Sequence, residues 1–212
     1  MEQIIILLAL ILSIILHEVA HGFAANALGD PTARLQGRLS LNPFVHIDPL
    51  GSVIVPALLY LSHAGVLFGW AKPVPYNPYN LRNQRYGDAL VAAAGPGTNF
   101  LLAVIFSVII RFSAALALSP TFISLAAMIV YINILLACFN LIPLPPLDGS
   151  KILMAVLPFR AQLRYRNLLM QIERYGIIVT FVFLFIFIQI LWAPFAHLVS
   201  LLFTLMTGIP GF

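Results

Sequence analysis

The chain has 212 residues, of which 61% are apolar and 8% are charged. Soluble proteins average roughly 45–50% apolar and about 25% charged residues, and a mean hydropathy of +1.01 leaves too few charges to cover a soluble surface. A membrane β-barrel is excluded as well, because its strands alternate apolar and polar residues over about ten positions, whereas this chain has long unbroken apolar runs. The composition therefore predicts a polytopic, all-α membrane protein.

The chain carries eleven Lys and Arg against seven Asp and Glu, a net charge of +4. In a membrane protein such an excess reports orientation and contact with anionic lipid headgroups, so we expect the lipid bilayer as a partner and no nucleic acid. The single cysteine, Cys138, excludes an intrachain disulfide and a C-x-x-C site. The start, Met1-Glu2-Gln3, lacks the Lys or Arg of a signal peptide, and we expect the first hydrophobic segment to stay in the mature protein.

The first predicted span covers residues 4–28 and ends at Gly29-Asp30-Pro31. Further apolar segments follow, separated by polar or proline-rich connections, at 50–70, 89–110, 121–142, 150–158 and 176–206. Asp88 is the predicted N-cap of the segment that follows it, and Gly95-Pro96-Gly97 inside that segment predicts a helix kink or a point of close packing.

The distribution of cations favours a re-entrant hairpin over a full span for residues 50–70. If the first span runs from outside to inside and 50–70 returns to the same side, only Arg111 among the loop cations considered lies outside, as the positive-inside rule requires. The cations that then share the cytoplasmic side are Arg34, Arg38, Lys72, Arg82, Arg85, Arg160, Arg164, Arg166 and Arg174. If 50–70 crosses fully, the cations divide between the two sides.

The first span contains His17-Glu18-Val19-Ala20-His21, which matches the zinc-protease pattern H-E-x-x-H. Residues four apart share one face of a helix, so His17 and His21 can both bind one metal ion. Glu18 then lies beside the metal, where it can accept a proton from an activated water. A purely structural polar patch is the less favoured interpretation, because each ionisable group near the bilayer centre costs roughly 2.5–3.5 kcal/mol.

Catalytic zinc usually has three protein ligands, and the few acids of the chain leave two candidates for the third, Asp48 and Asp148. Asp148 follows a long span and a proline-rich break that prevents a continuous helix. Irregular backbone at membrane depth is tolerated where it lines a cavity, which favours Asp148. Asp48 precedes a proline, a pattern typical of a turn.

Three further polar residues have two open interpretations each. His46 is either part of the turn that contains Asp48 or a gating or outer-shell partner of the metal site. Asn99 and Asn140 lie inside apolar spans, where they either form hydrogen bonds between helices or hold substrate backbone or an oxyanion.

Three motifs in this order resemble the site-2 protease family of intramembrane zinc metalloproteases. They are the H-E-x-x-H of residues 17–21, the Gly95-Pro96-Gly97-Thr98-Asn99 element, which is similar to the family's G-P-x-x-N, and residues 140–149, which match the family form N-x-x-P-x-P-x-L-D-G. Together they cover residues 17–149, most of the chain. The resemblance implies that His17, His21 and Asp148 bind one zinc ion and that Glu18 is the general base.

The resemblance also implies a three-helix catalytic core and a substrate that is itself a transmembrane helix. It suggests short edge strands at 33–41 and 67–76, near the active site. We expect one membrane-embedded domain over 1–212, with a catalytic core at about 4–157 and C-terminal helices at about 160–208, and no PDZ or CBS domain within these 212 residues. A compact form is therefore predicted, in a bacterial or archaeal cell membrane with basic loops cytoplasmic.

The function predicted from these motifs is hydrolysis of a peptide bond within or near the bilayer by zinc-activated water. The alternative is a metal-ion transporter in which His17, His21 and Asp148 form a transit site. A non-catalytic scaffold that binds membrane helices is a third interpretation.

Overall fold

The computed structural model describes residues 2–61, 69–174, 182–183 and 185–211. Every regular element in these residues is helical, and four helices are long and apolar enough to cross a membrane. They are Ile4–Ala27, Gly87–Arg111, Pro120–Asn140 and Phe187–Thr207. The prediction of an all-α, polytopic membrane protein is thereby confirmed.

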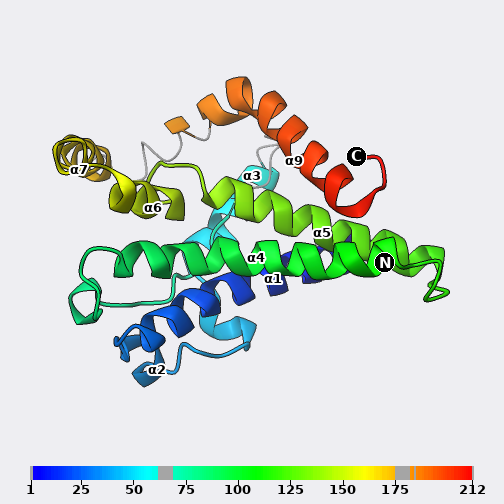
Figure 1. Cartoon of the computed structure of the whole chain (residues 1–212), viewed down its shortest axis with the longest axis horizontal. Coiled ribbons are helices and arrows are strands. Elements are labelled where there is room, and N and C mark those ends of the chain that lie inside the picture. Colours follow the sequence, from blue (N-terminus) through cyan, green and yellow to red (C-terminus); the bar gives the residue numbers. More distant parts are fainter. Residues whose placement is uncertain (1, 62–68, 175–181, 184, 212) are drawn as a thin grey trace.

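Three long helices run side by side along the long axis of the molecule (Figure 1). These are α1 (Glu2–Ala27), α4 (Gly87–Arg111) and α5 (Pro120–Asn140). The last helix, α9 (Trp192–Thr207), packs against α5 and α4. Shorter elements connect them: α2 (Thr32–Leu35), η1 (Pro43–His46), η2 (Pro49–Ile54), α3 (Val55–Leu61), η3 (Pro78–Asn80), α6 (Asp148–Val156), α7 (Phe159–Arg174) and η4 (Phe187–Leu191).

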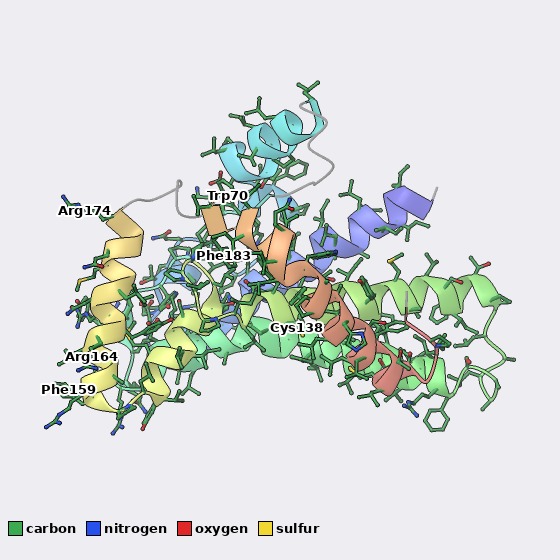
Figure 2. The ribbon with its side chains drawn as sticks, turned by 90° about the horizontal axis from the view of Figure 1, so that it is seen from above. Trp70, Cys138, Phe159, Arg164, Arg174 and Phe183 are labelled. Carbon is green, nitrogen blue, oxygen red and sulfur yellow. The ribbon has the colours of Figure 1, made fainter. Side chains whose placement is uncertain are left out.

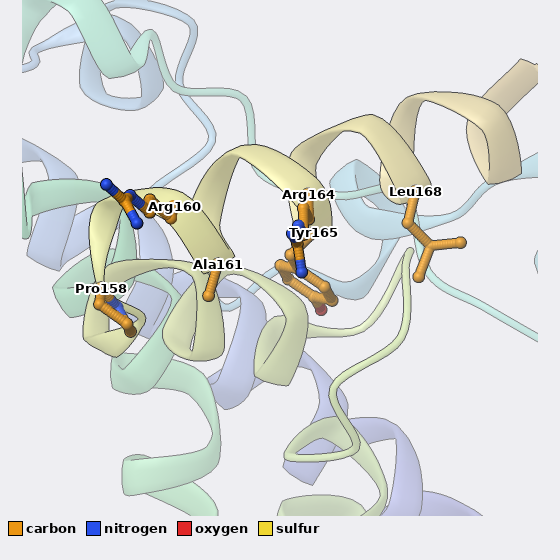
Figure 3. Close-up of a pocket in the computed structure, with 6 residues that line it drawn as sticks. All are labelled: Pro158, Arg160, Ala161, Arg164, Tyr165 and Leu168. Atoms are coloured by element: carbon orange, nitrogen blue, oxygen red, sulfur yellow. The ribbon is translucent and has the colours of Figure 1, made fainter.

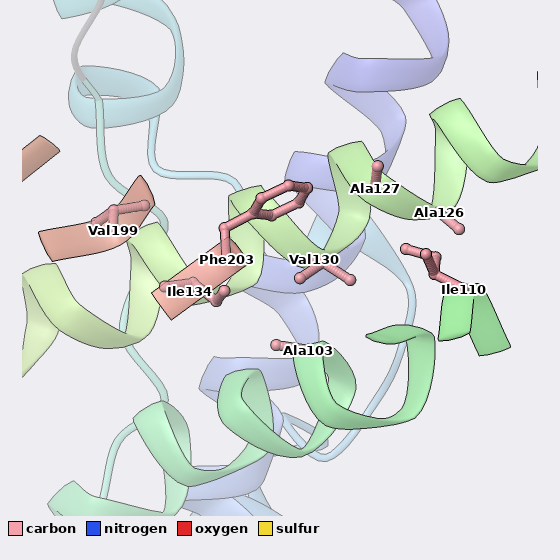
Figure 4. Packing of buried hydrophobic residues seen from close by; sticks show 8 residues of the cluster. All are labelled: Ala103, Ile110, Ala126, Ala127, Val130, Ile134, Val199 and Phe203. Atoms are coloured by element: carbon pink, nitrogen blue, oxygen red, sulfur yellow. The ribbon is translucent and has the colours of Figure 1, made fainter. Parts of the chain in front are cut away.

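Small residues let the long helices approach closely. Ala103 and Ile110 of α4 share one buried cluster with Ala126, Ala127 and Val130 of α5, and Phe203 of α9 belongs to the same cluster (Figure 4). Apolar surface gives helices no advantage over lipid tails, so close contact of this kind is the main source of attraction between them. The cluster fixes α4 and α5 relative to each other, and these two helices flank the polar site described below.

The segment predicted to re-enter the membrane has its two described ends in contact. The Trp70 amide donates a hydrogen bond of 3.1 Å to the carbonyl oxygen of Gly51, and the Trp70 ring lies against Gly51, where a Cβ would find no room. The rest of η2, all of α3 and residues 62–68 lie between these ends. Of these, only residues 62–68 are outside the described part of the chain. The segment is absent from the four candidate spans among the described residues, and its depth in a bilayer stays a prediction.

The short edge strands predicted at 33–41 and 67–76 are not present in the described residues of these ranges. Residues 33–35 belong to helix α2, and residues 69–76 have no regular secondary structure. Side chains use the backbone groups that a strand ladder would need. The Arg38 guanidinium donates to the carbonyl oxygens of Lys72 and Pro73 at 2.8 and 3.2 Å, and the Glu18 carboxylate accepts from the Val74 amide.

Two local predictions for α4 have different outcomes. Helix α4 begins at Gly87 with Tyr86 as its N-cap, so the prediction that Asp88 caps the helix is wrong. Asp88 instead lies in the first turn, where a negative charge favours the helix dipole, and it accepts a hydrogen bond from the Tyr76 hydroxyl. The helix continues through Pro96, and the close packing predicted at Gly95 is present, as described below.

Candidate metal centre

Helix α1 directs two histidines towards α4 and the start of α6. His17 and His21 are four residues apart and buried, with 6% and 8% of their surfaces exposed. Their Nε2 atoms lie 3.1 and 3.3 Å from one oxygen, Oδ2 of Asp148. Residues far apart in sequence therefore meet at one point, and Asp148, the favoured candidate for the third ligand, is the acid found there.

The other ring nitrogen of each histidine has its own hydrogen-bond partner. His17 Nδ1 donates to Asn99 Oδ1 at 2.5 Å, and His21 Nδ1 donates to the Val91 carbonyl oxygen at 2.7 Å. Since Nδ1 is the donor to the outer partner in both rings, Nε2 is the atom left to bind a metal ion when the ring is neutral. Metal-binding histidines show this arrangement, in which an outer partner fixes the tautomer and the ring orientation.

Asp148 is the first residue of α6, directly after the proline-rich connection 141–147. Gly149 is required next to it, because a Cβ at that position would overlap the backbone of Leu141 and Ile142. Burial alone would raise the pKa of the Asp148 carboxyl, but the hydrogen bonds from His17 and His21 outweigh it and lower the pKa to about 2. Asp148 is therefore a carboxylate, the form that binds a cation.

The chemistry and spacing of the three side chains fit zinc. Two imidazole nitrogens and a carboxylate oxygen are common zinc ligands, and the three ligand atoms all lie within 4.8 Å of one another. Ligands about 2.0–2.1 Å from a tetrahedral zinc ion are separated by about 3.3 Å. The two separations from Asp148 Oδ2, 3.1 and 3.3 Å, are close to that value, so the three side chains are placed to hold a zinc ion with a fourth position for water or substrate.

Glu18 lies beside these side chains and lines the same cavity of about 140 Å³. Its carboxylate accepts a hydrogen bond of 3.0 Å from the Val74 amide, so the backbone of the irregular segment 71–77 holds the Glu18 side chain in place. The residues lining the cavity are His17, Glu18, His21, Pro73, Val74, Tyr76, Val91, Ala92, Asn140, Pro146, Asp148 and Lys151.

Gly95 lets α4 approach the two histidines. A Cβ at this position would lie 2.5 Å from Nε2 of His21 and 2.6 Å from Nε2 of His17, far inside van der Waals contact. At Gly97, two residues further on, a Cβ would meet nothing within 4 Å. The first glycine of the motif therefore gives the candidate ligands their space, whereas the second has no such role.

Asn99 belongs to a buried amide network that supports His17. The Asn99 side chain is fully buried and donates to Asn133 Oδ1 at 2.8 Å and to the Ser13 carbonyl oxygen at 3.3 Å. Asn133 in turn donates to the Ser13 hydroxyl at 2.9 Å. Asn133 and Ser13 were not among the residues predicted from sequence, although polar groups inside apolar spans were the available signal.

The remaining predicted residues lie in different places. Asn140 lines the cavity, while its amide donates to the Leu136 carbonyl oxygen of its own helix. His46 lies outside the cavity, and its ring donates to the Ser40 carbonyl oxygen at 2.8 Å. Asp48 accepts from the Gly51 amide at 2.7 Å and caps η2, which is the turn chemistry expected of an acid before proline.

The cavity also contains a polar group that sequence reasoning missed. Lys151 Nζ donates to the Tyr76 hydroxyl at 2.8 Å, and the Tyr76 hydroxyl donates to Asp88. Burial and the contact with Asp88 raise the pKa of Tyr76, so this hydroxyl stays protonated. The available signal was the i, i+3 spacing of Asp148 and Lys151, which places both on one face of α6.

The membrane-spanning helices and the buried His, His and Asp define an integral membrane protein with a candidate metal centre. The model of peptidase family M50 matches residues 109–187. The chain is 36% identical over 189 residues to "Putative zinc metalloprotease YwhC" of Bacillus subtilis (strain 168), an alignment that covers 85% of this chain and 80% of that protein.

Two more distant relatives carry the name "Putative zinc metalloprotease Rip2". The protein from Mycolicibacterium smegmatis is 29% identical over 146 residues, and that from Mycobacterium tuberculosis is 28% identical over 142 residues. These alignments cover 69% and 66% of this chain and about half of each relative, 54% and 52%. No solved structure matches the chain. The chain belongs to peptidase family M50, the site-2 protease family, and is a zinc metalloprotease.

Proposed function

We propose that this chain is an intramembrane endopeptidase that hydrolyses a peptide bond in or near the transmembrane segment of another membrane protein. The observation that carries the proposal is the convergence of His17, His21 and Asp148 on one point, with Glu18 in the same cavity. His17, Glu18 and His21 lie on α1, which is long and apolar enough to span a bilayer, and Asp148 begins the short helix α6 beside it. A substrate bond must therefore come to a site that the membrane surrounds.

Each polar side chain of the cavity has a role in this proposal. His17, His21 and Asp148 hold one zinc ion, which when bound activates water and polarises the scissile carbonyl. Glu18 accepts the proton of the attacking water and later transfers it to the leaving amine nitrogen. The hydrogen bond from the Val74 amide keeps the Glu18 carboxylate at the cavity wall.

A transmembrane substrate must unwind locally before it can be cut, because a helix hides its carbonyl groups in hydrogen bonds. Residues 71–77 pass over the site without regular secondary structure and contribute Pro73, Val74 and Tyr76 to the cavity wall. In our proposal this segment borders the path by which the extended substrate reaches Glu18. In this proposal the basic loops face the cytoplasm, the side that the positive-inside rule predicts for them.

The substitution Glu18→Gln tests this function against metal transport through the same site. We expect the purified variant to retain zinc at the wild-type level and to lose nearly all cleavage of a single-span test substrate, because glutamine cannot accept the proton. Asp48→Asn is the matched control: it makes the same chemical change outside the cavity, and asparagine also caps helices. A Glu18→Gln protein that cleaves normally would refute the mechanism. Zinc flux into liposomes without any cleavage by the wild type would favour the transporter.

A further inference from the structure

Helix α7 lies across the direction of the spanning helices. In Figure 1 it is seen end-on at one end of the bundle, next to α6, while the axes of α1, α4 and α5 lie roughly in the plane of the picture. In Figure 2, turned by 90°, the ends of α7 are marked by Phe159 and Arg174, and its axis crosses that of the bundle. Because the spans run along the bilayer normal, a helix in this orientation lies in the plane of the membrane surface.

The sequence of α7 is that of an amphipathic helix with excess positive charge. It contains four arginines and one glutamate. One side of the helix packs inwards through Leu169, which is buried. Phe159, Leu163 and Met170 share another face, at spacings of four and seven residues, and they are 73%, 46% and 51% exposed. Exposed apolar residues with arginines around them are typical of helices in the headgroup region of a bilayer.

Two of the arginines border a surface hollow. Arg160 and Arg164, one helical turn apart, line it together with Pro158, Ala161, Tyr165 and Leu168 (Figure 3). Within the described residues, no carboxylate oxygen lies within 4.0 Å of either guanidinium. Guanidinium groups next to an apolar floor suit a phosphodiester headgroup whose acyl chains lie beside it.

We propose that α7 is an in-plane anchor that binds the anionic lipid headgroups of the bilayer surface, with Arg160 and Arg164 as the principal phosphate contacts. The anchor is joined to the metal centre by a specific contact. The Tyr165 hydroxyl donates a hydrogen bond of 2.8 Å to the Pro143 carbonyl oxygen, in the connection that leads to Asp148. Lipid binding at α7 therefore supports the backbone that carries a proposed zinc ligand.

Full-length protein in nanodiscs of phosphatidylcholine mixed with phosphatidylglycerol tests the anchor. Each arginine near an anionic surface contributes about fivefold in affinity, so Arg160→Gln with Arg164→Gln should lower the retention of phosphatidylglycerol over phosphatidylcholine by about 25-fold at these sites. Arg160→Lys with Arg164→Lys is the matched control, because it keeps both positive charges at the same positions and should keep most of the preference for phosphatidylglycerol. Equal loss in both double variants, or none in the glutamine variant, would overturn the proposal.

A spin label gives a second measurement that does not depend on lipid retention. With Cys138→Ala as background and the label on a cysteine at position 163, we expect the label to be more accessible to oxygen than to a water-soluble nickel chelate in the mixed nanodiscs. Accessibility to the nickel chelate equal to that of a label at position 82 would contradict an in-plane anchor.

A separate observation concerns Lys151, which lines the cavity from the face of α6 that carries Asp148. Its Nζ lies 4.9 Å from the centre of the Tyr76 ring and donates to the hydroxyl. Of the described carboxylates, none lies within 4.0 Å of this ammonium group. The neutral Tyr76 hydroxyl, itself fixed by Asp88, therefore orients a positive charge towards the cavity without neutralising it.

We infer, given the proposed function, that Lys151 donates a hydrogen bond to the oxyanion that develops on the substrate carbonyl. Water oxygen bonds to the carbonyl carbon, the carbonyl π electrons move to its oxygen, and Glu18 takes the water proton. When the oxyanion collapses, the bond from carbon to nitrogen breaks and the amine takes that proton. A cation near this oxygen stabilises the transition state more than the ground state.

The substitutions Lys151→Met and Lys151→Arg test this role. Removal of one oxyanion donor lowers kcat by about 10²–10³-fold, so we expect Lys151→Met to show that loss with unchanged zinc content and little change in KM. It should also bind a phosphinic peptide, which mimics the tetrahedral state, more weakly by a similar factor, and Lys151→Arg should recover much of both. Unchanged kcat, or parallel loss of zinc, would overturn the inference. A wild-type enzyme that cleaves nothing would instead refute the proposed function.

Discussion

Replacement of Asn99 by leucine removes the hydrogen-bond acceptor of His17 and keeps a side chain of similar size. Asn99 Oδ1 lies 2.5 Å from His17 Nδ1 in a fully buried position, so the imidazole N–H loses its partner where water does not replace it. An unsatisfied buried donor costs about 1–3 kcal/mol. Loss of an outer partner of a metal-binding histidine weakens metal affinity about 10–100-fold, or about 1.4–2.7 kcal/mol. The cost of the unsatisfied His17 N–H and the expected loss of zinc-binding free energy are therefore of similar size.

Competition between the protein and a chelator of known zinc affinity, in nanodiscs, measures this effect directly. We expect Asn99→Leu to bind zinc about 10–100-fold more weakly than the wild type. Ser107→Ala is the control, because Ser107 is buried on the same helix and its hydroxyl has no hydrogen-bond partner among the described residues. Its zinc affinity should not change. If a folded Asn99→Leu protein held zinc as tightly as the wild type, the proposed link between Asn99 and the metal would be refuted.

Gly95→Ala should abolish zinc binding while Gly97→Ala retains it, since only the first Cβ overlaps the histidine rings; equal zinc content in the two variants would count against the site geometry. Asp30→Ala should destabilise the fold by about 2–3 kcal/mol in thermal unfolding, because this buried carboxylate accepts hydrogen bonds from the side chains of Thr32 and Asn80 and from the Asn77 amide. Burial would raise the pKa of Asp30, but these hydrogen bonds lower it overall. Ionised Asp30 therefore makes its full contribution to the free energy of unfolding at pH values above its ordinary pKa of about 3.9. This contribution is lost as the pH falls from that value through the lower pKa that Asp30 has in the folded protein. A stability profile that is flat in this window, or the same in Asp30→Ala, would contradict this role.

The parts of the fold that depend on local sequence were predictable. Unbroken apolar runs predicted the spans, and the four-residue spacing of His17 and His21 placed both rings on one side of α1. The scarcity of acids, together with the proline-rich break that precedes Asp148, made this residue the favoured third ligand. These features follow from composition and helix geometry alone.

Contacts between distant segments were not predictable in this way. The edge strands expected from the family resemblance are absent from the described parts of 33–41 and 67–76, where the side chains of Arg38 and Glu18 form hydrogen bonds with the backbone of 72–74. The support of Asn99 by Asn133, and the contact of Lys151 with Tyr76, join residues 34 and 75 positions apart. No local periodicity encodes such pairs, since they arise only when the helices pack.

The most direct test of the central claim is to locate the bond that the enzyme cuts. Reconstituted wild-type protein with stoichiometric zinc should cleave a single-span substrate, and mass spectrometry of the products should place the cut within or at the edge of the apolar segment, with Glu18→Gln giving no product. Cleavage confined to a loop well outside the bilayer, or products of equal amount from Glu18→Gln, would contradict an intramembrane zinc endopeptidase.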